Sequence, residues 1–215
     1  MNRLIYPILF ILLFTSIANA QKSKAYNLQT LLKNGGIITA KPQSISALND
    51  GDKTGVACKS GVYWLKDVNF TSGTIDVDIK GRNVLQQSFV GIAFHGVDSI
   101  NTDIVYLRPF NFRSTDTLRK QHAVQYVSQP DYTWEKLREE HPLMYEQPVA
   151  TNLEPNGWVH VHIVVKGDAI TVYLNNSPKQ ALKVKKLGSR ADGMLGLWCF
   201  GSEEADFANL VVKKN

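Results

Sequence analysis

The chain contains 215 residues, of which 44% are hydrophobic and 20% charged, and its formal net charge is +5 at pH 7. This length suits a single domain that buries a sizeable core. The basic residues are scattered and form no dense stripe with interleaved aromatic residues, which argues against nucleic-acid binding.

The first twenty residues have the pattern of a secretory signal peptide. Arg3 precedes an apolar run at 4–14, and a small-residue cleavage sequence ends at Ala20. The apolar run is too short for a comfortable membrane span, and no second long apolar stretch follows it. We therefore expect a signal peptide at 1–20 and a secreted or periplasmic product.

Short strands separated by turn residues dominate the rest of the chain. Gly167-Asp168 is a strong turn signal that joins two of these strands into a hairpin. Only two short helices are expected, at 28–33 and 134–140. Regular short strands of this kind favour an all-β sandwich or jelly roll over a βα architecture. The expected strands are 62–68, 73–80, 89–95, 104–109, 123–128, 158–166, 169–174, 194–200 and 207–213.

Two of the expected strands, between residues 89 and 113, each have one apolar and one polar face. Alternation of this kind lets a sheet bury one side and present the other to a ligand. Gln125 alternates with apolar neighbours on a later strand and adds a further polar contact. The candidate polar positions of the two strands and their ends are His95, Tyr106, Arg108, Asn111 and Arg113.

His95 and Arg108 have the side chains best suited to chemistry in this stretch. His95 can act as a general acid or base or as a metal ligand, or it can merely donate a hydrogen bond to a loop carbonyl. Arg108 can hold a carboxylate or sugar hydroxyls through its planar fork of donors. The sequence leaves the alternatives for His95 open.

Residues 129–155 interrupt the strand pattern with four prolines and many aromatic and charged side chains. A long ordered loop of this composition is often functional. The alternative is a packing flap over a sheet edge, in which Arg138 and Glu146 pair for structural reasons. The candidate ligand contacts here are Trp134, Arg138 and Tyr145, and Glu146 is a candidate catalytic carboxylate.

Two further patterns have weaker implications. His160 and His162 share one strand face and would both be able to bind one metal, but no third ligand is visible, so two exposed polar positions explain them better. Cys58 and Cys199 would close a long loop if bridged, or they are two small buried residues. No cofactor is indicated, and a divalent metal is left open.

Several stretches together resemble secreted bacterial members of the concanavalin A-like lectin/glucanase superfamily. Within it, the chain is most similar to the 3-keto-disaccharide hydrolase-like group and its laminin-G-like relatives, over about residues 55–213. The stretches are SGVYWLKDVNFTSGTIDVDI, SFVGIAFHGVD, DIVYLRPFNFR, AVQYVSQP, WEKLREEHPLMYEQPV, NGWVHVHIVV and GMLGLWCFGSEEADFANLVV.

The resemblance implies a jelly-roll sandwich of two antiparallel sheets at 55–215, on which an N-terminal segment at 21–54 packs. It also implies a concave sheet that receives a carbohydrate or glycoconjugate. The chain departs from the glucanases of this superfamily, because it lacks their Glu-x-Asp-x-x-Glu strand, which sets two acids about 5–5.5 Å apart. Asp76-Val77-Asp78 is the nearest imitation, and its carboxylates fit a solvated face better.

Two classes of function follow. The first is a glycoside hydrolase or lyase acting on (3-keto-)glycosides, in which His95 or Glu146 removes a proton and Arg108 counters the developing negative charge. It requires His95, Arg108 and a flap carboxylate (Glu135, Glu139 or Glu146) to meet in one cleft. The second is a non-catalytic lectin-like module or an envelope interaction protein, with an open platform of aromatic and amide side chains. The sequence favours the enzyme slightly, and the oligomeric state stays open.

Overall fold

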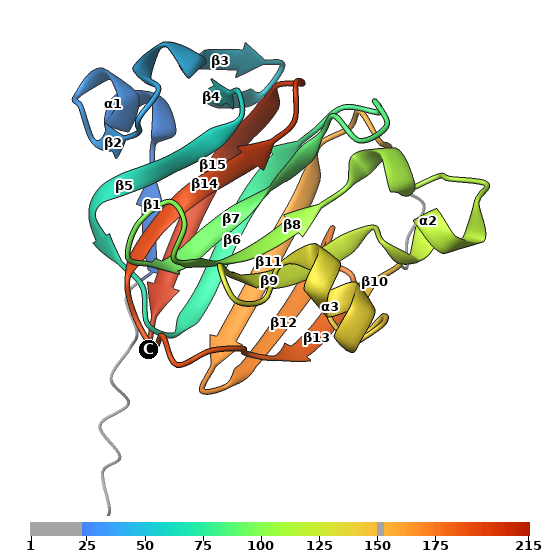
Figure 1. Cartoon of the computed structure of the whole chain (residues 1–215). Coiled ribbons are helices and arrows are strands. Elements are labelled where there is room, and N and C mark those ends of the chain that lie inside the picture. Colours follow the sequence, from blue (N-terminus) through green and yellow to red (C-terminus); the bar gives the residue numbers. More distant parts are fainter. Residues whose placement is uncertain (1–22, 150–152) are drawn as a thin grey trace, which may run out of the picture.

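The computed structural model describes residues 23–149 and 153–215, which form two antiparallel β-sheets packed face to face (Figure 1). The expected signal peptide lies outside the described residues. The first sheet, called sheet A, has the strand order β13-β12-β11-β6-β15-β4-β3, and β1 also pairs with β15. Its strands are β1 (Ser23–Tyr26), β3 (Ile45–Asp50), β4 (Lys53–Cys58), β6 (Gly73–Lys80), β11 (Val159–Lys166), β12 (Ala169–Leu174), β13 (Gln180–Lys185) and β15 (Ala205–Lys214).

The second sheet, called sheet B, has the order β10-β9-β8-β7-β14-β5-β2. The prediction of an all-β sandwich is therefore confirmed, as is the hairpin at Gly167-Asp168 that joins β11 to β12. The strands of sheet B are β2 (Ile37–Ile38), β5 (Gly61–Asn69), β7 (Phe89–Gly96), β8 (Thr102–Leu107), β9 (Val124–Gln129), β10 (Glu146–Gln147) and β14 (Met194–Phe200).

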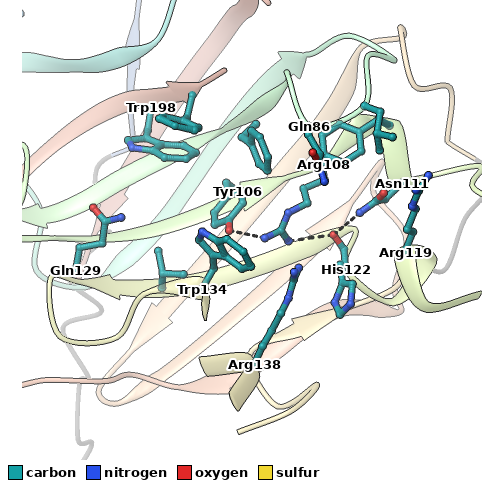
Figure 2. Close-up of a pocket in the computed structure, with 15 residues that line it drawn as sticks. Gln86, Tyr106, Arg108, Asn111, Arg119, His122, Gln129, Trp134, Arg138 and Trp198 are labelled. Carbon is teal, nitrogen blue, oxygen red and sulfur yellow. Dashed lines mark hydrogen bonds between the residues drawn. The ribbon is translucent and has the colours of Figure 1, made fainter. Parts of the chain in front are cut away.

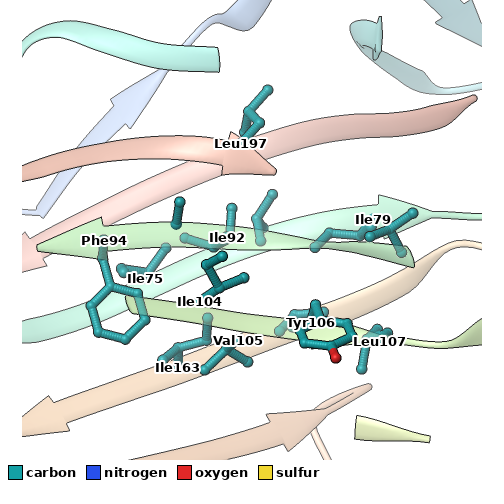
Figure 3. Packing of buried hydrophobic residues seen from close by; sticks show 14 of the residues in the cluster. Ile75, Ile79, Ile92, Phe94, Ile104, Val105, Tyr106, Leu107, Ile163 and Leu197 are labelled. Carbon is teal, nitrogen blue, oxygen red and sulfur yellow. The ribbon is translucent and has the colours of Figure 1, made fainter. Parts of the chain in front are cut away.

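The core lies between the inner faces of the two sheets. On β6, Ile75, Val77 and Ile79 are buried, and on β7 and β8 so are Ile92 and Val105. Figure 3 shows Ile75 and Ile79 of sheet A close to Ile92 and Val105 of sheet B. Burying each large apolar side chain contributes roughly 1.5–3 kcal/mol relative to leaving it exposed, so the period-two pattern of the strands decides which faces meet.

Three short α-helices and two 3₁₀ turns complete the described chain: α1 (Leu28–Lys33), α2 (Thr117–Gln121), α3 (Trp134–Glu140), η1 (Pro42–Ser44) and η2 (Pro109–Asn111). Their sequence caps explain where the helices begin. Asp116 accepts backbone hydrogen bonds at the start of α2, and Thr133 accepts one at the start of α3. α3 buries Leu137 and lies on the side of β9 and β10 (Figure 1). Among the described residues, no helix is long and apolar enough to cross a membrane.

Residues 23–54 are built into both sheets. β1 pairs with β15 and β3 pairs with β4 in sheet A, while β2 pairs with β5 in sheet B. Cys58 on β4 and Cys199 on β14 are buried free thiols. Burial raises the pKa of Cys58 well above its usual value and that of Cys199 to about 12, so both behave as small apolar residues.

Candidate functional site

A row of five residues crosses five strands of sheet B in direct register. Trp198 on β14 pairs with Gly91 on β7, Gly91 with Tyr106 on β8, Tyr106 with Gln125 on β9, and Gln125 with Glu146 on β10. Directly paired residues point to the same face of a sheet, here the face away from sheet A. Four strand spacings make this row roughly 19 Å long.

Gly91 lets the two aromatic residues of the row meet. The rings of Trp198 and Tyr106 lie 5.1 Å apart between centroids, on either side of a position without a side chain. Phe200 stacks on Trp198 with ring centroids 6.4 Å apart, and Phe89 contacts both Phe200 and Tyr106. The result is a continuous aromatic surface on the outer face of sheet B.

We expect Gly91→Ala to destabilise the protein by about 3 kcal/mol, at the upper end of the usual range for overpacking. A Cβ at Gly91 would lie 2.1 Å from the backbone oxygen of Val105 and 2.6 Å from Cα of Tyr106, so neither neighbour can give way easily. Urea unfolding measures the change. The matched control is Gly61→Ala on β5, where the nearest atoms lie at 3.5 Å, and it should be neutral or stabilising by up to about 1 kcal/mol. Equal unfolding midpoints for the two variants would contradict the expected clash.

A cavity of about 530 Å³ lies over this face, a volume usual for small-molecule sites. Its walls come from the β6–β7 loop, η2, α2 and its C-terminal residue, and α3. Figure 2 shows Tyr106, Arg108 and Trp134 in the middle, with Trp198 toward one end and Arg119 and His122 toward the other. The lining residues are Leu85, Gln86, Phe89, Tyr106, Arg108, Phe110, Asn111, Arg119, His122, Val127, Gln129, Trp134, Arg138, Trp198 and Phe200.

Arg108 is the centre of a buried hydrogen-bond network at the floor of the cavity. Its Nη2 donates to the hydroxyl of Tyr106 at 2.7 Å and to Oε1 of Gln125 at 2.5 Å, and its Nη1 donates to the backbone oxygen of His122 at 3.1 Å. The Tyr106 hydroxyl donates in turn to Gln125. Burial raises the pKa of Tyr106 to about 12, so its hydroxyl remains protonated at neutral pH.

Glu146 is the carboxylate that balances the arginines behind the cavity wall. Its side chain is only 2% exposed, and it accepts hydrogen bonds from Nε and Nη2 of Arg138 at 2.9–3.2 Å. Nη1 of Arg108 lies 3.6 Å from Oε2 of Glu146. Arg138 also places its guanidinium 4.8 Å from the ring centroid of Trp134. The paired Arg138 and Glu146 thus fix α3 and its aromatic residue against β10.

His122 follows α2 and faces both the cavity and Glu146. Its Nδ1 lies 2.7 Å from Oε1 of Glu146, although the approach is poorly aligned for a hydrogen bond. Burial lowers the pKa of His122 below its usual value; the Glu146 carboxylate opposes this shift, and the guanidiniums of Arg138 and Arg108 reinforce it. The imidazole is therefore mainly neutral at neutral pH.

Three of the four buried side-chain polar atoms without a hydrogen-bond partner among the described residues gather around the same network, and the fourth, Nε of Arg190, belongs to the residue that binds Asp103. The three are Oδ1 of Asn111, Nδ1 of His122 and Nε2 of Gln125. Asn111 and His122 both line the cavity. Because unpaired buried polar groups are costly, these atoms are suited to hydrogen bonds with a polar ligand or with water.

Most of the residues expected from the sequence come together here. Five of them line the cavity, namely Tyr106, Arg108, Asn111, Trp134 and Arg138. Gln125 and Glu146 lie directly beneath it and hold the arginines in place. Arg113 and Tyr145 do not line the cavity. Arg113 forms an ion pair with Glu154, and the ring of Tyr145 packs against those of Tyr126 and His141.

His95 is not part of this site, which corrects the expectation that it shares a cleft with Arg108 and Glu146. Its side chain is 0% exposed, with Nδ1 2.8 Å from Oδ2 of Asp103 and Nε2 2.9 Å from the backbone oxygen of Thr71. Both ring nitrogens are therefore occupied. His95 lies near the opposite end of β7 from Phe89, roughly 20 Å away along the strand.

The His-x-His pattern forms a polar ladder on the outer face of sheet A. His160 pairs with Asp78 and His162 with Asp76, with Nδ1 of each imidazole 2.8 and 2.6 Å from the carboxylate oxygen. Burial opposes ionisation of Asp78, but hydrogen bonds from Lys53, Asn209 and His160 outweigh it and lower the pKa of Asp78. Across the described ranges, no group of three or more His, Cys, Asp or Glu residues could hold a metal ion.

The sequence-based candidates left out His122, Arg119 and the two phenylalanines of the aromatic surface, Phe89 and Phe200. Phe89 and Phe200 lie two residues from the row members Gly91 and Trp198 on the same strands, so they share the face of the row, but the row itself becomes visible only from the strand register. No pattern singled out His122 or Arg119, since both belong to the short α2 segment, which carries no amphipathic stripe. The pattern around Trp198 does not show which way its ring points, because both faces of its strand are apolar in sequence.

Comparison with known proteins identifies the fold. No protein-family model matches the sequence, and a search of curated proteins found no match. Among solved structures, the carbohydrate-binding module CBM66 from Bacillus subtilis is 14% identical with a TM-score of 0.55, covering 83% of this chain and 96% of its own. A Bacillus licheniformis β-glucanase is 12% identical with a TM-score of 0.54, covering 92% and 100%.

A third similar structure is the exoplasmic/lumenal domain of VIP36 in its Ca²⁺/Man3GlcNAc-bound form, 8% identical with a TM-score of 0.50, covering 83% and 87%. The protein has the concanavalin A-like lectin/glucanase fold. At these identities the comparison establishes the fold alone. The three similar structures are a binding module, a hydrolase and a glycan-bound domain, so the fold by itself does not choose among these activities.

Proposed function

We propose that this protein binds an oligosaccharide in the cavity on the outer face of sheet B, and that it does so as an exported protein, given the leader-like residues 1–20. The observation that carries the proposal is the composition of the cavity wall. It combines an aromatic surface, centred on Trp198 and Tyr106, with guanidinium and amide groups and a long row across the sheet. Aromatic faces suit the apolar C–H faces of sugar rings, and polar groups beside them suit the hydroxyls.

Binding is better supported than glycoside hydrolysis. Hydrolysis by the common mechanisms needs two carboxyl groups facing the scissile bond. Among the described residues that line the cavity there is no Asp or Glu, and Glu146 is buried and engaged with Arg138 and Arg108. The sequence slightly favours an enzyme, but this wall has the features expected of a binding module.

Acid–base chemistry at the same cavity is a second candidate, and one observation favours it. His122 lines the cavity as a mainly neutral imidazole beside Glu146, and Arg108 and Arg138 lie next to it. A neutral imidazole can accept a proton from a carbon next to a keto group, and guanidiniums counter the negative charge that develops. A hydrolase or lyase that acts on glycosides, including 3-keto-glycosides, would use His122 and the two arginines in these roles.

We expect some oligosaccharides in a broad glycan library that includes 3-keto-glucosides to raise the melting temperature of the protein. At a ligand concentration of 100 Kd, binding adds about 2.7 kcal/mol to the free energy of unfolding. Trp198→Ala should weaken the best hit by roughly 30-fold in titration calorimetry, because truncating a central aromatic contact costs about 2 kcal/mol. Tyr173→Ala, an aromatic residue on the outer face of sheet A, is the control and should bind normally.

Two outcomes would change the proposal. A library without any hit would refute carbohydrate binding at this cavity. Release of a product from a hit by the wild-type protein, together with its loss in His122→Asn at unchanged affinity, would favour the acid–base candidate over a binding module.

A further inference from the structure

The cavity carries an excess of positive charge. In the part of the chain that the structure describes, its lining contains Arg108, Arg119, Arg138 and the imidazole of His122, and no carboxylate. Glu146 behind the wall contacts Arg108 and Arg138, and Asp116 lies 3.5 Å from Arg119. Three guanidiniums against these two carboxylates leave a local charge of +1, and only Arg119 has its carboxylate partner on the exposed surface. Glu135 lies nearby on α3 and does not line the cavity. Binding a neutral sugar would not require this excess.

The buried part of the excess is costly in the protein alone. The side chain of Arg108 is 5% exposed, and burial lowers its pKa, because the charged form has lost water. The neighbouring charge of Arg138 acts on Arg108 in the same direction, as like charges do. An anion in the cavity would reduce both effects. Among the described residues, Glu146 is the one anion beside Arg108, and its carboxylate already accepts hydrogen bonds from Nε and Nη2 of Arg138.

The aromatic and cationic groups meet in the middle of the cavity, where Arg108 lies 4.8 Å from the ring centroid of Tyr106, and separate only toward its two ends. Trp198 lies toward one end, whereas Arg119 and His122 lie toward the other, with Arg108 between them (Figure 2). Arg119 is exposed on α2 and lies 3.5 Å from Asp116, an ion pair of the kind that contributes little. An oligosaccharide with one sugar ring packed on Trp198 would therefore place a neighbouring sugar beside the guanidiniums.

We propose that the oligosaccharide taken by this cavity is acidic, with an oxyanion group, the carboxylate of a uronate or a sulfate ester, seated in the part of the cavity lined by Arg108, Arg119 and Arg138. This inference rests on the proposed carbohydrate binding and specifies its ligand class. Arginine suits both groups, because its planar donors match the paired oxygens of carboxylates and of sulfate-like anions.

The test is an oligosaccharide array on the full-length protein that includes uronate-containing, sulfated and neutral members. Its reference pair is tetragalacturonate and its methyl ester, which share a backbone and differ in charge. Acidic members should bind at least about tenfold tighter than their esterified or desulfated counterparts. Raising the salt from about 0.05 M to 0.5 M should weaken only the acidic ligands, because it screens the exposed guanidiniums.

Arg119→Gln and Lys120→Gln form a matched pair of variants, since both lie on α2, both remove one positive charge, and only Arg119 lines the cavity. We expect Arg119→Gln to weaken acidic ligands about tenfold and to leave neutral ones unchanged. Lys120→Gln should change neither by more than about twofold. Separate uronate and sulfate arms distinguish the two sources of the anion.

The outcomes separate this inference from the proposed function. Binding of neutral and acidic members with equal affinity, unaffected by salt, would overturn the inference and keep carbohydrate binding. Equal effects of Arg119→Gln and Lys120→Gln would also overturn it, because the loss of affinity would then follow from the net charge of the protein and not from a contact in the cavity. No binding across the array would overturn the proposed function itself.

Discussion

Replacing Glu146 by glutamine should lower the free energy of unfolding by about 3–5 kcal/mol. Glutamine has nearly the shape of glutamate, so the change removes charge and leaves the packing intact. It leaves Arg108, 5% exposed, and Arg138 without the carboxylate that they share. The groups that still accept hydrogen bonds from Arg108 are all neutral, namely the Tyr106 hydroxyl, the Gln125 side chain and the backbone oxygen of His122.

A fall of this size should lower the melting temperature by roughly 6–20 °C for a domain of this length. Glu139→Gln, an exposed carboxylate on α3, is the control and should change stability by no more than about 0.5 kcal/mol. The double variant Glu146→Gln/Arg138→Gln should recover part of the loss, because it also removes one unbalanced cation. If Glu146→Gln unfolds at the wild-type temperature, the carboxylate does not stabilise this network.

Several elements were predictable because their local pattern agrees with the fold. The bounds of β6, β12 and β14 match the predicted strands, and those of α1 and α3 match the predicted helices. β6 alternates without interruption, and α3 begins after a capping Thr133. β3, with the sequence ISALND, was missed, because it is a mostly exposed edge strand and its apolar residues do not alternate regularly.

The candidate site was only partly predictable, since it depends on register between distant strands. The sequence indicated that Tyr106 and Arg108 share a polar strand face, and the Arg138–Glu146 pair was considered. It contained no local signal that Trp198 would lie across Gly91 from Tyr106, because that alignment is a property of β14 pairing with β7. The same limit explains His95, whose partner Thr71 belongs to another part of the chain.

The positions of His95 and Arg108 divide the polar residues of β7 and β8 into two kinds. At one end of the sandwich, His95 and Asp103 satisfy each other and have no exposure, so they leave nothing to offer a ligand. At the other end, Tyr106 and Arg108 belong to a wall with unpaired polar atoms and surplus charge. Burial and access to the cavity, which sequence alone does not reveal, distinguish the structural network around Asp103 from a binding site.

Asp103→Asn should destabilise the protein by about 3–5 kcal/mol without changing ligand binding. Oδ1 of Asp103 accepts hydrogen bonds from Oγ of Ser128 at 2.7 Å and Nη2 of Arg190 at 2.9 Å, and Oδ2 lies 2.8 Å from Nδ1 of His95. This carboxylate thereby joins β7, β8, β9 and the loop after β13 at one point. An asparagine keeps the volume but leaves Arg190 without its buried counter-charge.

Urea unfolding measures the effect, and Asp52→Asn is the control. Because the side chain of Asp52 is 89% exposed and its carboxylate lies 3.9 Å from Nζ of Lys53, this control should change the free energy of unfolding by less than about 1 kcal/mol. Affinity for any oligosaccharide hit, measured below the unfolding transition, should stay within about twofold of wild type, since Asp103 does not line the cavity. A variant that remains stable but loses affinity would contradict the division between the two ends of the sandwich, because it would mean that the His95 network acts on the ligand after all.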